Sequence, residues 1–530
     1  MARKDRVKFQ LVKKANKGNL QSIYQLYKHC INPKNEDDPD TIRKCISDMD
    51  KIVRSNSCLL GSADFKDFRK LREFSISFES DITVIVGDNG CGKTAILDGV
   101  VRSLSWLVNN IEREKVNGKT ILDSDINVHC DDFSEIRAKL ILDRNSIFNV
   151  SVAKPVEGLP AKKDGNYVEV KDLGSVYRLI NGLEQLDLPV FANYNVTRSS
   201  TKLSAHNFET FHSDIRSNRF EAYQGFGNEQ DISTEFAQKY IMLHNLSSNS
   251  ETSKLQEEIE NLKSLIADMY DGEEVDPEDR LVKRLELKKE ELSSLYEKSF
   301  SKEYSRNLEL VNDAIEKVVP SIKSLRIDRS SGFLRLIVDS FGVAVNVTQI
   351  SKGQQVMLAL VGDLALKMIG LNPHMENPLS ASGIVFIDEI DLHLHPSWQQ
   401  SVLLNLQDVF ENLQFIVTTH SPQVLSTVEA RCIRQVIDDG TGALVAKTPD
   451  FQTKGVTSSD ILAEIMGTVS IPENVEEAQW VESFYGYLRS NDIERYSSML
   501  LKIKEHFGED HPIVEECESN IRISQMRLED

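Results

Sequence analysis

The sequence has few cysteines and no long apolar run. Its seven cysteines are dispersed and include no C-x-x-C pair, which argues against both a disulfide framework and a cysteine-rich zinc site. No stretch approaches the roughly 18 apolar residues that are needed to cross a bilayer. The N-terminal residues are charged and lack the apolar core of a signal peptide. We therefore expect a soluble, cytoplasmic protein without a membrane partner.

Basic charge is also scarce. The chain carries 62 Lys and Arg against 82 Asp and Glu, which gives a formal net charge of −20. Proteins that coat nucleic acid usually have a basic surface, because phosphate contacts dominate their affinity. The net charge therefore disfavours that class of function. Residues 3–17 are a local exception with seven Lys or Arg, although such a cluster on a helix is more often a solvated face.

The hydrophobic periodicity changes several times along the 530 residues. Helical spacing dominates both ends, whereas short β-branched runs occur between them. The predicted divisions are a helical N-terminal extension (1–54), an N-lobe (55–246), a short coiled-coil hairpin insertion (247–303), a C-lobe (304–470) and a C-terminal helical region expected to bind partners (471–530).

Within the insertion, apolar residues follow the 4-3-4-3 spacing of a coiled-coil seam. They are Leu255, Ile259, Leu262, Ile266 and Met269 in the first arm, then Leu285, Leu292 and Leu295 in the second. A segment with Gly272 and Pro277 separates the arms. This pattern predicts a short antiparallel hairpin of ~30–38 Å. A helical insertion packed on the body is equally compatible with it.

A phosphate-binding loop is the most informative motif. The segment Gly87-Asp88-Asn89-Gly90-Cys91-Gly92-Lys93-Thr94 fits G-x-x-x-x-G-K-[ST] and lies between a predicted strand, Ile82–Val86, and a predicted helix, Ala95–Leu107. Glycines let backbone N–H groups point at phosphate oxygens, and a helix N-terminus favours the anion. Lys93 should reach the β- and γ-phosphates, and the Thr94 hydroxyl should bind Mg²⁺. The other expected ATP-binding residues of the loop are Gly87, Asn89, Gly90, Cys91 and Gly92.

A second motif is an apolar strand that ends in two acids. The strand Gly383–Ile387 leads directly into Asp388 and Glu389. We expect Asp388 to hold Mg²⁺ through water and Glu389 to polarise the attacking water. Such a strand end is a weak indication alone, but together with the phosphate loop it predicts a nucleotide hydrolase that uses ATP and Mg²⁺.

A third motif precedes a long apolar helix, Val356–Ile369. The residues Ser351, Gly353 and Gln354 resemble the ABC-class signature, in which a serine, a glycine and a helix N-terminus clamp the γ-phosphate. Lys352 stands where the first glycine of that signature usually occurs, a variation that is also found in the chromosome-maintenance and repair branch.

Histidines follow the acidic strand end. His420 ends a strand-like run that begins at Phe415, and it resembles the switch histidine of the ABC class, which implies a catalytic role. His393 and His395 are two residues apart, but no further Cys or His completes a metal site. They are better explained as loop residues of the segment Ile390–Pro396, which resembles the D-loop of repair-type ABC ATPases.

Taken in this order, the motifs resemble those of the RecF and SMC branch of ABC ATPases over residues 59–470. The resemblance implies an α/β, ABC-type P-loop ATPase fold with a short coiled-coil hairpin insertion and helical N- and C-terminal extensions. In that class the phosphate loop of one subunit faces the signature of another, with ATP between them. A homodimer or higher oligomer is therefore implied.

A narrower resemblance depends on the short hairpin, the segments Leu188–Arg198 and Gly455–Gly467, and the C-terminal helices. Together they are similar to the Septu anti-phage ATPases (PtuA), and the helical N-terminal addition is similar to the form that accompanies some retrons. This resemblance implies an HNH nuclease (PtuB-like) as partner. In retrons it also implies a reverse transcriptase with its RNA–DNA hybrid.

The sequence shows no nuclease motif of its own. OLD-type ATPases carry a Toprim nuclease with a Glu and an Asp-x-Asp cluster. Here the only candidate acids, Asp438 and Asp439, lie between two strand-like runs, Cys432–Ile437 and Ala443–Ala446, where a hairpin turn is expected. There is no His-Asn-His set either. We expect the chain to hydrolyse ATP but not to cut nucleic acid by itself.

The sequence therefore favours an ABC-type ATPase of a bacterial anti-phage defence system that hydrolyses ATP as a dimer and regulates an HNH nuclease. One alternative is a RecF-like DNA repair ATPase that acts on DNA ends or gaps, which would require DNA binding by the isolated dimer despite the net charge. Another is a scaffold that binds ATP but hardly hydrolyses it. A transporter subunit is disfavoured by the chromosome-type motifs.

Overall fold

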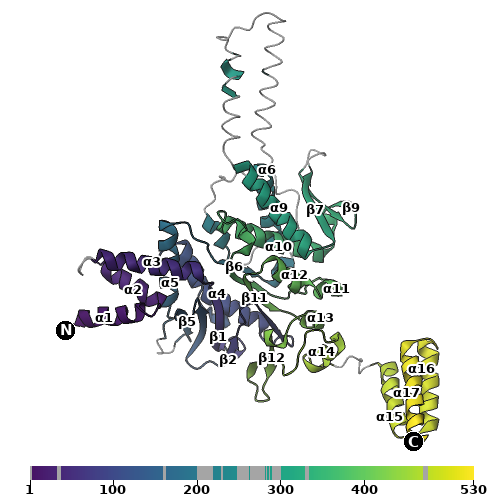
Figure 1. Cartoon of the computed structure of the whole chain (residues 1–530). Helices are drawn as coiled ribbons and strands as arrows, with labels where there is room; N and C mark the ends of the chain where they lie inside the picture. Colours follow the sequence, from purple (N-terminus) through teal and green to yellow (C-terminus); the bar gives the residue numbers. More distant parts are fainter. Residues whose placement is uncertain are drawn as a thin grey trace, which may run out of the picture. The chain divides into compact units, whose positions relative to one another are not determined.

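The computed structural model describes most of the chain as two compact units (Figure 1). The described residues are 3–32, 38–158, 163–199, 219–227, 231–247, 300–328, 334–468 and 475–529, with isolated residues between 262 and 288. The large unit spans Met1–Gly455 and the small unit Val456–Asp530. The predicted hairpin lies mostly outside the described residues. Of its predicted seam only Leu262 and Leu285 are described, and both are buried.

A six-stranded sheet lies at the centre of the large unit (Figure 1). Its strands in spatial order are β13 (Leu444–Lys447), β12 (Ile433–Asp438), β3 (Ile82–Gly87), β11 (Leu413–Thr418), β10 (Gly383–Ile387) and β6 (Val190–Tyr194). All pairs are parallel except the edge pair of β12 and β13. Strands β10 and β11 are fully buried, as parallel strands covered on both faces require. The predicted strands at Ile82, Gly383 and Phe415 are confirmed.

Helix α10 (Lys352–Leu371) is the central helix of the large unit. By length and composition it could span a membrane, but 83% of its apolar window is buried inside the structure. It packs against α6 (Ile232–Ser247) and α9 (Phe300–Val318). It begins at Lys352, before the predicted start at Val356, so that the signature residues form its N-cap and first turn. Among the described residues, the other α-helices of this unit, apart from the N-terminal three, are α4 (Lys93–Glu112), α5 (Val168–Leu183), α11 (Pro396–Gln399), α12 (Val402–Val409) and α13 (Pro422–Leu425).

The described residues of the large unit also form two antiparallel sheets. One has the order β2 (Leu71–Ser77), β1 (Leu59–Phe68), β4 (Phe133–Ile141) and β5 (Ile147–Pro155), and helix α4 contacts it. The other has the order β7 (Ile322–Asp328), β8 (Arg335–Ser340) and β9 (Val343–Asn346). Apolar patterning of the sequence predicts strands at Phe74–Phe78, Ala138–Leu142 and Phe148–Val152, which overlap β2, β4 and β5, whereas β1 and the three-stranded sheet were not predicted.

Three helices precede the first strand, as the sequence predicts. They are α1 (Arg3–Ala15), α2 (Leu20–Cys30) and α3 (Pro39–Ser55). Asn19 caps α2, because its side chain accepts a hydrogen bond from the backbone N–H of Ser22 at 2.9 Å. Helices α2 and α3 both pack against α5, and Lys28 forms a 2.7 Å ion pair with Asp172 of that helix. The apolar faces of α2 and α3 are therefore covered by the ATPase body.

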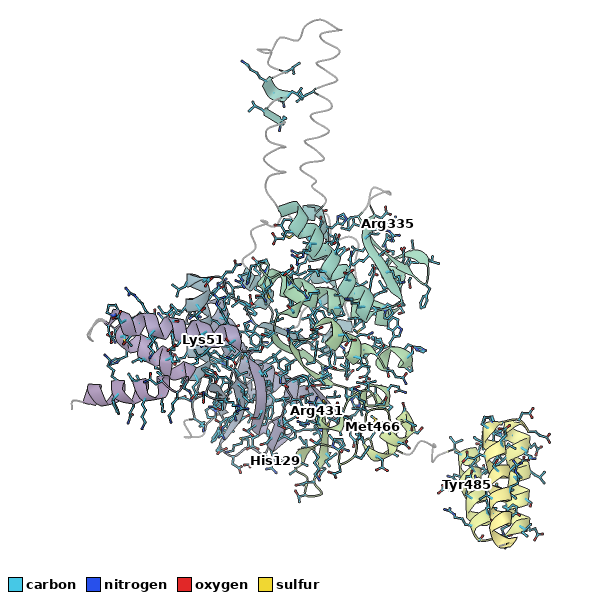
Figure 2. The ribbon with its side chains drawn as sticks, in the orientation of Figure 1. Lys51, His129, Arg335, Arg431, Met466 and Tyr485 are labelled. Atoms are coloured by element: carbon cyan, nitrogen blue, oxygen red, sulfur yellow. The ribbon has the colours of Figure 1, made fainter. Side chains whose placement is uncertain are left out.

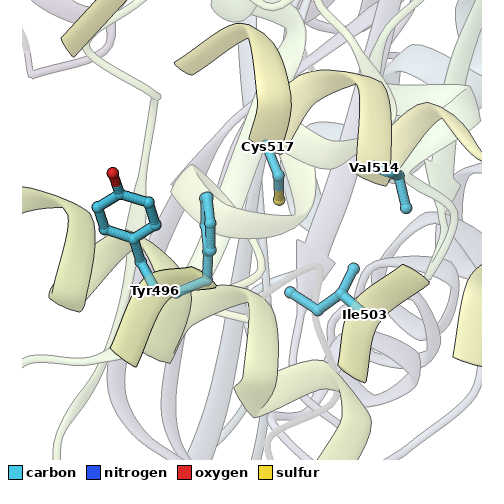
Figure 3. Close-up of a cluster of buried hydrophobic side chains, with 5 residues drawn as sticks. Tyr496, Ile503, Val514 and Cys517 are labelled. Atoms are coloured by element: carbon cyan, nitrogen blue, oxygen red, sulfur yellow. The ribbon is translucent and has the colours of Figure 1, made fainter. Parts of the chain in front are cut away.

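The described residues of the small unit form four helices. They are α14 (Ser458–Glu464), α15 (Glu476–Arg489), α16 (Ile493–Phe507) and α17 (Pro512–Glu529). Figure 3 shows the cluster that joins the last three helices. Its buried members are Phe484, Tyr496, Ile503, Val514 and Cys517. Gly508 ends α16 with a positive φ of 92°, a conformation that glycine adopts without steric cost. The region 471–530, for which the sequence predicts helices, contains α15, α16 and α17 in its described residues.

Because Phe484 is fully buried at the centre of this cluster, Phe484→Ala should destabilise the small unit by about 3–5 kcal/mol. Amide hydrogen exchange of residues 475–529 should rise accordingly, while exchange in the large unit stays unchanged. Leu501→Ala is the matched control, since Leu501 lies in the same bundle but is 68% exposed. Equal effects of the two substitutions would show that the cluster does not stabilise this unit.

Candidate functional site

The phosphate loop connects strand β3 to helix α4, as the sequence predicts. Gly90 and Gly92 have φ values of 80° and 96°, a backbone region that disfavours other residues. A Cβ at Gly87 would lie only 2.5 Å from the carbonyl oxygen of Val436 on β12. Gly92 is the N-cap of α4 and provides no side-chain cap. The first amides of the helix are therefore suited to an anion such as a phosphate.

Lys93 is directed back over this loop. Its Nζ donates hydrogen bonds to the carbonyl oxygens of Gly87 at 2.7 Å and Asp88 at 3.0 Å, and the side chain is buried. A second cation lies beside the loop, because Lys70 Nζ is 3.4 Å from the position that a Cβ would take at Gly90. Lys70 comes from the turn between β1 and β2, and no sequence motif indicated it.

Asp388, which follows β10, contacts the start of helix α4 and the end of strand β11 through its carboxylate. Thr94, at the start of α4, donates a hydrogen bond from Oγ1 to Asp388 Oδ2 at 2.8 Å. Thr418, the last residue of β11, donates a hydrogen bond to Asp388 Oδ1. A hydroxyl and a carboxylate at one point are the oxygen ligands that Mg²⁺ prefers. These residues therefore fit the predicted metal, and the contact brings together residues 294 positions apart in the chain.

Glu389 follows in a turn with a left-handed backbone, at φ 49°. Its backbone N–H donates to Thr418 Oγ1 at 2.7 Å, and its carbonyl oxygen accepts from the backbone N–H of Leu392 at 3.0 Å. The sequence alone places the Glu389 carboxylate next to the metal-type ligands. The left-handed backbone of Glu389 is visible only in the structure.

Arg198 lies behind this turn and was not predicted as a site residue. It belongs to the 3₁₀ helix η2 (Val196–Ser199), which follows β6. Its guanidinium donates to the carbonyl oxygens of Asp388 and Glu389, the latter at 2.6 Å. Burial lowers the pKa of Arg198 to about 10, against the opposing effect of the nearby carboxylates. Arg198 therefore remains a cation at neutral pH.

His420 comes directly after β11, at the same edge of the sheet. Its backbone N–H donates to Asp391 Oδ1 at 3.3 Å, and the same oxygen accepts from Thr419 Oγ1 at 2.6 Å. Because the carboxyl ends of parallel strands lie on one edge of a sheet, His420 belongs to the same group as the phosphate loop, Asp388 and Glu389.

The signature residues form a separate group. Ser351 is the N-cap of α10 and accepts from the backbone N–H of Gln354 at 3.3 Å, while Gln354 Oε1 accepts from the backbone N–H of Ser351 at 2.9 Å. Gln354 Nε2 also donates to Ser321 and Ser340. A Cβ at Gly353 would lie 2.3 Å from the carbonyl oxygen of His393. The Gln354 side chain thus stabilises the signature turn.

One other group of potential metal ligands occurs in the described part of the chain. Ligand atoms of Asp67, Cys130 and Asp132 lie within 4.8 Å of one another. Asp132 already forms a 2.8 Å ion pair with Lys66, and burial raises the pKa of the Cys130 thiol. A protonated thiol and a neutralised carboxylate are poor metal ligands, which disfavours a metal site here.

Comparison with known families agrees with this geometry. The model described as "AAA domain, putative AbiEii toxin, Type IV TA system" matches residues 82–426, from the strand before the phosphate loop to the helix after His420. The chain belongs to this family. The α/β ATPase fold with helical extensions that the sequence predicts is confirmed by the sheets and helices of the structure together with this match.

Two curated relatives of this AAA-family chain are described as probable ATPases of retrons. It is 29% identical to "Retron Ec83 probable ATPase" of Escherichia coli over 96% of both chains. It is also 29% identical to "Retron Vc95 probable ATPase" of Vibrio cholerae serotype O1 biovar El Tor, over 87% of this chain and 89% of the relative. The similarity to "Septu protein PtuA" of Bacillus thuringiensis is 31% but spans 21% of this chain and 28% of the relative.

Among solved structures, this AAA-family chain is similar to an Smc head domain with an extended coiled coil, derived from Pyrococcus furiosus and bound to the C-terminal domain of ScpA. The identity is 18%, the TM-score is 0.39, and the alignment covers 74% of this chain and 96% of the Smc chain.

Proposed function

We propose that this chain is an ATPase of a bacterial anti-phage defence system of the Septu and retron type. It would bind and hydrolyse ATP as a dimer and regulate an associated HNH nuclease. The main support is the contact of Thr94 with Asp388, which brings the phosphate loop, an oxygen ligand pair and the Glu389 carboxylate to one edge of the sheet. Similarity to retron ATPases over nearly the full length supports the biological setting.

In this proposal each residue acts through its charge or its hydrogen bonds. Lys93 and the amides of the Gly87–Thr94 loop hold the phosphates, and Thr94 and Asp388 hold Mg²⁺, which neutralises charge on the β- and γ-phosphates when it is bound. Glu389 accepts a hydrogen bond from the attacking water and orients it toward the γ-phosphate. His420 contacts the γ-phosphate from the end of β11.

The proposed dimer completes the site with a second copy of the chain. Ser351, Gly353 and Gln354 of one subunit would face the phosphate loop of the other. The capping box at Ser351 supports this arrangement, because it fixes the N-terminus of α10 as a rigid, anion-compatible end. The hydrogen bonds of Ser351 and Gln354 in the structure lie within this cap and its neighbouring serines.

The proposed partners are a PtuB-like HNH nuclease and, in a retron, a reverse transcriptase with its RNA–DNA hybrid. All would meet the chain in the cytoplasm. The small unit is the proposed docking element, because it has its own hydrophobic cluster and contains none of the predicted nucleotide motifs. The apolar faces of helices α2 and α3 pack on α5, so their role is to stabilise the ATPase body.

The role of the site is tested by two substitutions. Lys93→Ala should weaken ATP binding, because it removes the cation at the phosphate loop. Glu389→Gln should leave ATP binding intact and lower turnover by about 10²–10⁴. Binding of a fluorescent ATP analogue and release of phosphate measure the two effects. Lys51→Ala, at an exposed lysine of α3 (Figure 2), and Glu376→Gln, at an exposed loop position, are matched controls. Wild-type turnover by Glu389→Gln would refute the role of Glu389.

The two-subunit site is tested by mixing. Lys93→Ala and Ser351→Arg chains should each lack turnover, but a mixed dimer contains one site with an intact loop and an intact signature. Mixing should therefore restore part of the activity. Because Ser351 also caps α10, thermal unfolding of the Ser351→Arg chain must first show that it is folded. Mixed dimers that are demonstrated by affinity tags but never hydrolyse ATP would exclude the composite site.

Nuclease regulation is tested with the partner present. The purified chain with ATP and Mg²⁺ should leave DNA and RNA intact, because it has no nuclease motif. Co-expression with a PtuB-like HNH nuclease should yield a complex, and nucleic-acid cleavage by this complex should differ between wild-type and Glu389→Gln chains. DNA binding by the isolated dimer without capture of any nuclease would favour the RecF-like alternative instead.

A further inference from the structure

Glu389 has a backbone conformation that needs external support. Its φ of 49° lies in the left-handed region, which is unfavourable for a residue with a long side chain and persists only where surrounding groups fix it. The direction of the Glu389 carboxylate depends on this backbone. Whatever holds the turn therefore also determines where the carboxylate points.

We propose that Arg198 is a positioning residue that fixes the Asp388–Glu389 turn and thereby orients the Glu389 carboxylate. This inference rests on the proposed ATPase function. One guanidinium donates to the two successive carbonyl oxygens of this turn, with Nη1 on Asp388 and Nη2 on Glu389, the latter at 2.6 Å. The planar fork of an arginine can hold two acceptors in a fixed geometry, which the single ammonium of a lysine cannot reproduce.

Arg198 is itself held firmly. Its Nη1 also donates to the carbonyl oxygen of Asn195 at 2.9 Å and contacts that of Tyr194 at 3.3 Å. The Tyr194 carbonyl in turn accepts from the backbone N–H of Asp388 at 2.8 Å. The arginine, the end of β6 and the acidic turn thus form one closed set of hydrogen bonds, so movement of the turn would break several of them together.

Electrostatics explain why a charged side chain occupies this buried position. Arg198 is 1% exposed, and burial of a cation is costly unless opposite charges compensate it. The carboxylates of Asp388, Glu389 and Asp391 supply that compensation. Conversely, Arg198 offsets the mutual repulsion of three carboxylates on one short segment. A neutral replacement would leave these charges close together without their buried counter-ion.

The test compares Arg198→Lys with Arg219→Lys. Arg219 is a matched control, because it is also partly buried and donates to two backbone carbonyls, those of Leu371 and Leu186, at 2.6 and 2.7 Å. Arg198→Lys should lower kcat by about 10²-fold, the cost of a misplacement near 1 Å, with the KM for ATP unchanged. Arg219→Lys should keep the wild-type kcat. A wild-type kcat for Arg198→Lys would overturn the proposal.

A double substitution separates positioning from general damage. If Arg198 acts through Glu389, Arg198→Lys combined with Glu389→Gln should turn over no more slowly than Glu389→Gln alone. Additive losses would overturn the proposal. If Arg198→Lys does not fold, Arg198→Gln is measured in the same way. Failure of both to fold, while Arg219→Lys folds, would assign Arg198 to stability only and would also overturn it.

A crystal structure of the Arg198→Lys chain provides a readout that does not depend on turnover. Glu389 should leave its left-handed conformation in that structure. A turn that keeps its φ near 49° would overturn the positioning role of Arg198. This outcome is independent of turnover, whereas a wild-type rate of Glu389→Gln would refute only the role of Glu389 in activating water. Failure of the proposed function and failure of this inference are therefore distinguishable.

Discussion

The Asp388 carboxylate is the contact on which the site depends. One oxygen accepts from Thr94 at the start of α4, and the other accepts from Thr418 at the end of β11. The same Thr418 hydroxyl oxygen receives the backbone N–H of Glu389. Two threonines and one aspartate therefore fix the relative positions of the phosphate loop, the metal-type ligands and the following glutamate. This is possible because parallel strands place their carboxyl ends at one edge, so that short side chains can span the strands.

The fixed geometry carries an electrostatic cost. Lys93, Arg198 and Asp388 are all buried, and each loses hydration that only nearby partners can replace. Lys93 donates to the backbone carbonyls of Gly87 and Asp88, whereas Asp388 accepts from the hydroxyls of Thr94 and Thr418. A site of this kind is polar and preorganised before any ligand binds, so little reorganisation is needed when charge develops on a phosphate.

The sequence predicts those parts of the fold in which local pattern and tertiary environment agree. Strands β3, β10 and β11 are continuous apolar runs because both of their faces are buried. Strand β7 was missed because a register shift between Lys323 and Arg326 breaks its alternation. Helix α6 was missed because its buried residues include aromatics such as Phe236 and Tyr240, which favour strands by propensity. Lys70 and Arg198 could not be identified, since only tertiary structure brings them to the loop and the acidic turn.

The end of β6 connects the acidic turn to the signature helix. The Tyr194 carbonyl accepts from the backbone N–H of Asp388 at 2.8 Å, while the Tyr194 hydroxyl donates to Asp363 of α10 at 2.9 Å. Asp363 also accepts from Lys367 at 2.6 Å. Hydrogen bonds between buried groups are costly to break without replacement. A displacement of the acidic turn must therefore either break this set or move α10, whose N-terminus is the Ser351 cap. Tyr194 therefore connects the Asp388–Glu389 turn to α10, the helix whose N-terminus would face the second nucleotide in the proposed dimer.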